Sequence, residues 1–331
     1  MSQNSSVLYD APGPRTRRLT VIASVVIAVL IAAGVYFFIY QPLAERGEFT
    51  MDKWGPLIDP DDPEFAPLWK RLGKGFRATL TAAALAIVSS LVLGTALAVL
   101  RVQLRALQRR RFADMPTAVA LALRALSWLI TVVTRFCLEV FRGLPVVITI
   151  FFVWVILPDL GIELSLLWYL VIGLTIYNMV VIGEILRSGM EGLPGGQVEA
   201  AQAIGLTSFQ TTRMVLLPQG FRVMLPALIS QLVVVLKDTS LGFIIGYEEI
   251  MRVARQVIPV LETPNTIQLY FVVGVIYITA NYLLSKLAEY VQRRLSRARK
   301  TGTLAPPPTQ PLPPAAITAQ AAAGTSGGAS H

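Results

Sequence analysis

The strongest constraint on this chain is a set of long segments that carry almost no charge. Residues 20–40 hold no charged side chain, and residues 78–100, 164–183 and 266–285 share this property. A helix rises 1.5 Å per residue, so about 20 apolar residues cross the roughly 30 Å hydrocarbon core of a bilayer. Only 15% of the 331 residues are charged, against about 25% in a soluble domain. The pattern therefore predicts an all-α, polytopic membrane protein.

We expect about six transmembrane helices, of which the third is the hardest to assign. Residues 121–142 carry a polar stripe on one helical face. We expect them to be largely interfacial or cytoplasmic, with a break at residues 143–145 and a crossing at residues 145–157 that part of the preceding helix assists. The six expected crossings are residues 20–40, 78–100, 145–157, 164–183, 223–246 and 266–285. A seventh would place the last basic cluster outside, against the tendency of Lys and Arg to stay cytoplasmic.

Basic residues mark the expected cytoplasmic side. Lys and Arg outnumber Asp and Glu by 29 to 20, and they gather at the ends of the apolar segments. The clusters are Arg15, Arg17 and Arg18; Arg101, Arg105, Arg109, Arg110 and Arg111; and Arg293, Arg294, Arg297, Arg299 and Lys300. Positive charge beside a span indicates the cytoplasmic face. We therefore expect both termini in the cytoplasm, the lipid bilayer around the chain, and no nucleic-acid partner.

The counts of cysteine and histidine exclude several kinds of disulfide, metal and catalytic site. The chain has one cysteine, Cys137, and one histidine, His331, so it forms no internal disulfide, no Cys/His metal site and no Ser-His or Cys-His catalytic arrangement. We expect Cys137 to be a small buried apolar residue. A P-loop is also missing, because Gly73-Lys74 is followed by Gly75 and not by Ser or Thr. The sequence predicts no catalytic, cofactor-binding or metal residue, and so no enzyme.

The segment between the fourth and fifth expected crossings is too polar to span a membrane. Residues 197–204 are rich in alanine, and Gly205 is placed to end a helix in a left-handed turn. Thr207, with Gln210 three residues later, forms a capping-box pattern that begins a second helix, and Pro218 is expected to end it. The residues alone leave two interpretations, an amphipathic helix at the membrane surface or a small helix that enters a groove of another protein.

The spacing of this segment resembles a known pattern. Glu199-Ala200-Ala201, then Gly205, then Val215-Leu216-Leu217-Pro218 resembles the EAA loop of the ABC importer permeases, with valine in the usual place of isoleucine. In that family the loop forms a coupling helix that docks into a cleft of the ATP-hydrolysing subunit. The resemblance implies that residues 191–218 are a cytoplasmic coupling loop. Its implied coupling residues are Glu199, Ala200, Ala201, Gly205, Leu217 and Pro218.

Further stretches are similar to the polar amino-acid permeases, the histidine, glutamine, glutamate and arginine group. They are residues 139–145, 184–189, 217–219 and 237–241. The resemblance covers about residues 71–294 and implies a five-helix core, to which this chain adds an N-terminal helix. It also implies a second permease subunit, identical or related, two ABC ATPase subunits and an extracytoplasmic solute-binding protein. Within the group, the pattern is most similar to glutamate permeases.

Five polar residues within the expected spans are candidates for the substrate path. They are Asn178, Gln231, Lys237, Asp238 and Thr239. A charge inside the bilayer costs about 2.5–3.5 kcal/mol on insertion scales, so Lys237 and Asp238 should face the protein interior or a water-filled cavity. Two interpretations stay open: these side chains border the path of an amino acid, or they form interhelical pairs that hold a gate.

The charge and hydropathy pattern predicts the organisation of the chain. The segments are a cytoplasmic N-terminus (1–19), an extra transmembrane helix (20–40), an acidic, proline-rich extracytoplasmic loop (41–75), an ABC importer transmembrane domain (76–294) and a basic, then Pro/Ala-rich tail (295–331). We expect a permease without a cofactor that imports a polar amino acid, glutamate first, across the plasma membrane of a bacterium. The alternative is an ion-driven secondary transporter, which explains the intramembrane charges but not the EAA-like loop.

Overall fold

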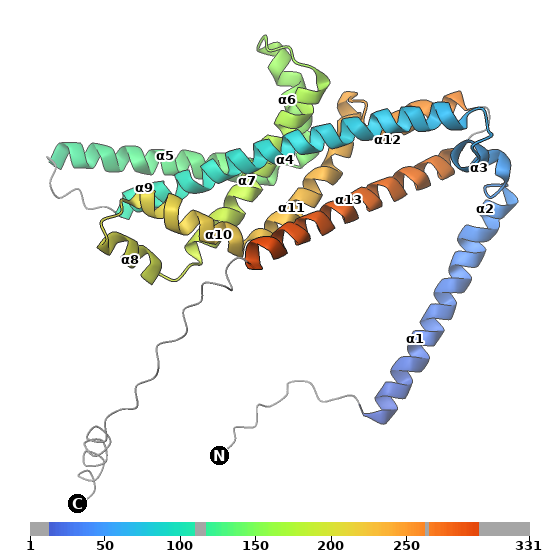
Figure 1. The fold of residues 1–331 in the computed structure, drawn as a ribbon, viewed down its shortest axis with the longest axis horizontal. Coiled ribbons are helices and arrows are strands. Elements are labelled where there is room, and N and C mark those ends of the chain that lie inside the picture. The colour runs from blue at the N-terminus through green and yellow to red at the C-terminus, as the bar shows by residue number, and fades with distance from the viewer. Residues whose placement is uncertain (1–12, 110–116, 262–264, 298–331) are drawn as a thin grey trace, which may run out of the picture. The chain divides into compact units, whose positions relative to one another are not determined.

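The computed structural model describes residues 13–109, 117–261 and 265–297, and every regular element in these residues is helical (Figure 1). The expected N-terminal segment and C-terminal tail lie largely outside the described residues, as do Arg110 and Arg111. The hydrophobic core lies in the first of two compact units, Met1–Glu289, and the second unit, Tyr290–His331, includes the C-terminal end of α13.

The helices follow one another with few irregular residues between them. The α-helices are α1 Pro14–Val35, α2 Gln41–Glu45, α3 Met51–Ile58, α4 Phe65–Arg109, α5 Thr117–Gly143, α6 Val146–Asp159, α7 Leu166–Glu191, α8 Gly196–Ala203, α9 Ser208–Thr211, α10 Leu217–Val223, α11 Leu225–Asp238, α12 Ile250–Val257 and α13 Thr266–Arg297. Two π-helical turns, Tyr36–Tyr40 and Thr212–Leu216, and two 3-10 turns, Thr239–Ile245 and Ile258–Val260, complete the series.

Among the described residues, six helical segments are long and apolar enough to cross a membrane, as the sequence predicts. They are Pro14–Glu45, Phe65–Gln108, Val119–Gly143, Leu166–Glu191, Leu225–Ile245 and Thr266–Arg294. By length and composition alone the third candidate is α5 and not residues 145–157, where we expect the third crossing, and that expectation stays a prediction. Helix α6 has 14 residues and is therefore only about 21 Å long, whereas α5 supplies 25 suitable residues, because its polar stripe occupies one face alone.

The break expected between α5 and α6 is confirmed. Pro145 has φ −58° and ψ 139° and immediately precedes α6, so the chain turns sharply there (Figure 1). Helix α5 is packed along a narrow strip, and Ser127 and Leu138 are its buried residues. Cys137 is exposed. The expectation of a buried cysteine is therefore wrong, because the face of α5 that carries it has no packing partner within the described chain.

Helix α7 is the centre of the core. Leu170, Leu174 and Leu186 on it are fully buried, against residues of α4, α6 and α11. Close approach of α4 and α7 depends on two glycines: a Cβ on Gly94 would lie 2.8 Å from Ile182 Cγ2, and one on Gly183 would lie 3.2 Å from the Gly94 carbonyl oxygen. The backbones of α4 and α7 are thus in direct contact, and the pair forms the scaffold for the polar loop.

The acidic segment before α4 packs on the transmembrane helices rather than forming an open loop. Leu57 of α3 is buried in a cluster with residues of α4, α12 and α13. Gln268 Nε2 donates to the Glu48 carbonyl at 2.6 Å and to its carboxylate at 3.0 Å, and Asn265 Nδ2 donates to the Lys53 carbonyl at 2.7 Å. Lys53 pairs with Glu48 at 2.7 Å. Hydrogen bonds from Lys53 and Gln268 hold the pKa of the Glu48 carboxyl below its usual value.

Candidate functional site

The EAA-like segment folds into two short helices joined by a tight turn. Helix α8 ends at Ala203, and Gly205 adopts φ +83°, the left-handed conformation expected of it. Thr207 and Gln210 form both hydrogen bonds of the capping box, at 3.3 and 2.8 Å. These local predictions are confirmed, because each depends on residues only a few positions apart.

The second helix does not end at Pro218. The chain stays helical from α9 through the π turn Thr212–Leu216 into α10, which continues to Val223. Within the π turn the Leu217 N–H donates to the Thr212 carbonyl, five residues back. Pro218 follows directly, at the start of α10, where its missing N–H leaves no intrahelical hydrogen bond unmade. The expected end at this proline is therefore wrong.

Most of the predicted coupling residues lie on the surface. Glu199, Ala200, Gly205 and Pro218 are exposed, Leu217 is half-buried, and Ala201 is only 4% exposed and packs inward. Three large apolar side chains that the sequence analysis missed are also exposed on the loop: Ile204, Phe209 and Met214. The sequence could have predicted this contact surface, because apolar residues in a segment too polar to span a membrane indicate one.

The loop is bound to the two scaffold helices. Gln103 Nε2 of α4 donates to Thr212 Oγ1 at 2.7 Å and to the Ser208 carbonyl at 3.3 Å. Helix α10 lies against α7 at two glycines, since a Cβ on Gly189 would lie 2.9 Å from the Gly220 carbonyl oxygen. The loop is thus hydrogen-bonded to α4 and packed closely on α7.

A row of alternating charges connects the ends of α4 and α7 that lie near the loop. Glu184 pairs with both Arg101 of α4 and Arg187, which lies three residues later on α7. Glu191 pairs with both Arg187 and Arg105. Two carboxylates thus join three guanidinium groups, so the contact of α4 with α7 is electrostatic at this end. In the middle it is mainly apolar, with a hydrogen bond of 2.6 Å between the hydroxyls of Ser89 and Thr175.

Two of the five substrate-path candidates bind each other. Asn178 of α7 is fully buried, and its Oδ1 accepts a hydrogen bond of 2.7 Å from Gln231 Nε2 of α11. Its Nδ2 donates to the Leu174 carbonyl at 2.8 Å. The side chain of Asn178 therefore connects two transmembrane helices, while Gln231 is only partly buried.

The other three candidates lie at the end of α11. Lys237 is exposed, Asp238 is half-buried, and Thr239 is fully buried with its hydroxyl bonded to the Leu236 carbonyl at 2.6 Å. Among the described residues, neither Lys237 nor Asp238 forms an interhelical ion pair. The ion pairs that the gate alternative requires are therefore not seen among residues 13–109, 117–261 and 265–297. The described part of the chain also contains no cluster of three or more metal-ligating side chains.

The comparison with known protein families decides the identity of the fold. Residues 114–297, more than half of the chain, match the model of the binding-protein-dependent transport system inner membrane components. The chain belongs to this family. The match includes α5 to α13 and thus the whole EAA-like loop, so the resemblance noted in the sequence is confirmed.

Individual relatives of this permease extend the match beyond the family model. It is 38% identical over 275 residues to the glutamate transport system permease protein GluD of Corynebacterium glutamicum, covering 81% of this chain and 89% of GluD. It is 32% identical over 225 residues to a probable glutamine ABC transporter permease protein, GlnP of Bacillus subtilis, covering 67% of this chain and 93% of GlnP.

Solved structures support the fold of the permease. A crystal structure of an amino acid ABC transporter with histidines aligns with a TM-score of 0.54 at 24% identity and covers 70% of this chain and 95% of that one. A methionine ABC transporter in an inward-facing conformation aligns with a TM-score of 0.53 at 19% identity, over 69% and 97%. The family match and the relatives make the protein a multi-pass inner-membrane transport component, and the ion-driven alternative is not favoured.

Proposed function

We propose that this permease is the membrane subunit of an ATP-binding-cassette importer for a polar amino acid, with glutamate as the first candidate. The 38% identity to a glutamate permease supports the substrate class. The observation that carries the proposal is the folded coupling loop, residues 191–218, with exposed Glu199 and Ala200 on α8 and a left-handed turn at Gly205. The chain itself hydrolyses no ATP and uses no cofactor, because a separate ATPase subunit supplies the energy.

The coupling loop has the properties that a docking element requires. Small side chains on α8 let another surface come close to its backbone, and exposed Ile204, Phe209 and Met214 provide apolar area for burial. Gln103 holds the loop against α4. When the ATPase subunits close, the loops move together, and α4 and α7 are reoriented with them. This gives alternating access in a pair of permease subunits that are identical or related.

The substrate path is assigned to the polar end of α11. Lys237 and Asp238 carry opposite charges and form no interhelical pair in the described chain, so both remain free for the carboxylate and the ammonium of an amino acid. Thr239 stabilises the turn beside them, and the bond between Asn178 and Gln231 maintains the spacing of α7 and α11. An extracytoplasmic solute-binding protein delivers the substrate, and both termini of the permease are cytoplasmic.

Reconstitution tests this function directly. Proteoliposomes would contain this chain, an ATPase subunit, a partner permease where needed and the solute-binding protein, with or without trapped ATP. We expect accumulation of labelled glutamate that requires ATP and no ion gradient. ATP-driven uptake of glutamine or arginine instead would change only the substrate. Uptake that needs an ion gradient and ignores ATP would refute the proposal.

The coupling role of α8 is tested by a matched pair of substitutions. Ala200→Asp places a charge on the proposed docking face, and Ala66→Asp makes the same change at another exposed helical alanine, near the opposite end of α4. We expect Ala200→Asp to abolish co-purification of the ATPase subunit and Ala66→Asp to leave it intact. Equal recovery of the ATPase with both variants would remove α8 from the docking surface.

A further inference from the structure

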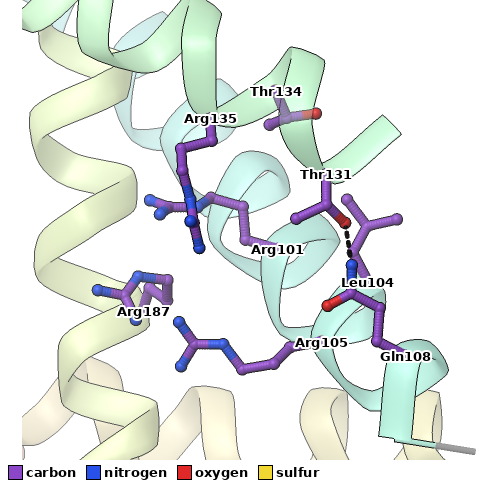
Figure 2. Close-up of a pocket in the computed structure, with 8 residues that line it drawn as sticks. All are labelled: Arg101, Leu104, Arg105, Gln108, Thr131, Thr134, Arg135 and Arg187. Atoms are coloured by element: carbon purple, nitrogen blue, oxygen red, sulfur yellow. Dashed lines mark hydrogen bonds between the residues drawn. The ribbon is translucent and has the colours of Figure 1, made fainter. Parts of the chain in front are cut away.

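A small basic cavity lies beside the charge row, between α4, α5 and α7 (Figure 2). It encloses about 50 Å³. The residues that line it are Arg101, Leu104, Arg105, Gln108, Thr131, Thr134, Arg135 and Arg187. None of these is acidic, and the coupling loop and the proposed substrate path contribute no side chain to it.

The cavity has an excess of positive charge. Figure 2 shows the guanidinium groups of its four arginines gathered around one space. Glu184 and Glu191 neutralise part of this charge through Arg101, Arg105 and Arg187. Four guanidinium groups and two carboxylates leave a net charge of about +2, and Arg135 forms no hydrogen bond or ion pair within the described chain.

The donors and the volume of the cavity match a phosphate group. Arginine presents several N–H donors in a planar fork that fits phosphate oxygens, and four arginines line this cavity. A water molecule needs roughly 10–15 Å³ of such space, so 50 Å³ holds about four oxygen-sized atoms, as many as a phosphate has. The space is too small for a whole nucleotide.

The surroundings of Arg135 also favour an anion from the membrane surface. This residue is exposed on α5 beside Val132 and Phe136, two exposed apolar side chains. An unpaired guanidinium on an apolar helix is costly, and it becomes favourable when its long side chain reaches an anionic group at the interface. Anionic headgroups attract each nearby Arg by about 1 kcal/mol.

We propose that this cavity binds a phosphate group, with Arg135 as the main contact and the headgroup of an anionic phospholipid or a small soluble phosphate as its source. The bound phosphate neutralises the excess charge and connects α5 to the row of ion pairs between α4 and α7. Gln103, which holds the coupling loop, lies on the same stretch of α4 as Arg101 and Arg105. Occupancy therefore stabilises the position of the loop against α4.

The test compares two arginines on the same helix. Arg135→Gln removes the unpaired guanidinium, and Arg124→Gln removes an exposed arginine of α5 that does not line the cavity. The full chain is placed in phosphatidylcholine nanodiscs with increasing phosphatidylglycerol, and retained phosphatidylglycerol is counted by native mass spectrometry. In a second arm without phosphatidylglycerol, binding of labelled inorganic phosphate is measured by equilibrium dialysis.

We expect Arg135→Gln to weaken the tightest phosphatidylglycerol or phosphate site about tenfold, the effect of losing a hydrogen bond to a charged group. Arg124→Gln should change the affinity of this site less than twofold. The arm that responds identifies the source as lipid or soluble phosphate. Equal losses with both arginine variants, or no loss in either arm, would overturn the proposal, and neither readout depends on ATP or on transport.

Discussion

The hydrogen bond between Asn178 and Gln231 gives the sharpest test of the helix packing. It is a side-chain hydrogen bond that joins α7 to α11, at 2.7 Å, with Asn178 fully buried. Asn178→Ala and Gln231→Ala each remove one partner, and each also changes packing and local backbone bonding. The double variant separates these effects, because the packing changes cancel in the thermodynamic cycle and the interaction remains.

The expected coupling follows from the environment of the bond. Interhelical hydrogen bonds in membrane proteins contribute about 0.6 kcal/mol on average and about 1.7 kcal/mol at most. Because both bonds of Asn178 are short and its side chain is fully buried, we expect a coupling energy in the upper half of that range, about 1.2–1.7 kcal/mol. This corresponds to a factor of about 8–18 in the unfolding equilibrium.

The free energy of unfolding is measured in bicelles for the wild type, both single variants and the double variant. Ser230 provides the control, since it precedes Gln231 on α11 and its hydroxyl bonds only to the Pro226 carbonyl of its own helix, at 3.1 Å. We expect the changes in the free energy of unfolding caused by Asn178→Ala and Ser230→Ala to be additive, with no coupling energy. A coupling of Asn178 with Gln231 no larger than this control would refute the argument that the pair holds α7 to α11.

Three further predictions test the loop, the helix packing and the acidic segment. Gly205→Ala, at φ +83°, should cost about 1–2 kcal/mol of strain and lower the affinity of the coupling loop for its ATPase in a titration, whereas Gly196→Ala, at an open helical position, should have no such effect. Gly94→Ala should destabilise the fold by about 1–3 kcal/mol through overpacking in thermal unfolding, while Gly274→Ala, with nothing within 4 Å of its added Cβ, should not. The pKa of Glu48 is lower in the folded state than in the unfolded state. The stabilisation that its carboxylate gives is therefore present above the unfolded pKa and is lost as pH falls through the folded value. We expect the hydrogen-exchange rate of residues 48–58 to rise on acidification, and Glu48→Gln to remove this pH dependence.

Local sequence patterns were sufficient to predict the helix start and the turn within residues 191–218. The capping box at Thr207 and the left-handed Gly205 depend on residues within a few positions of each other, and both are confirmed. The break at Pro145 is confirmed for the same reason. Pro218 misled the prediction, because a proline near the start of a helical segment is compatible with helix, and the π turn before it keeps the chain continuous.

The sequence by itself determined that the chain is helical and crosses a membrane about six times, because length and apolar composition decide this without reference to neighbours. Only the tertiary structure showed which polar side chains meet. Gln103 contacts Thr212, Arg101 contacts Glu184, and Asn178 contacts Gln231, in pairs that lie 109, 83 and 53 residues apart. Nothing in local periodicity specifies these contacts. They arise because the packing of α4, α7, α11 and the loop brings these groups together, and a fully buried group such as Asn178 needs a partner where no water can supply one.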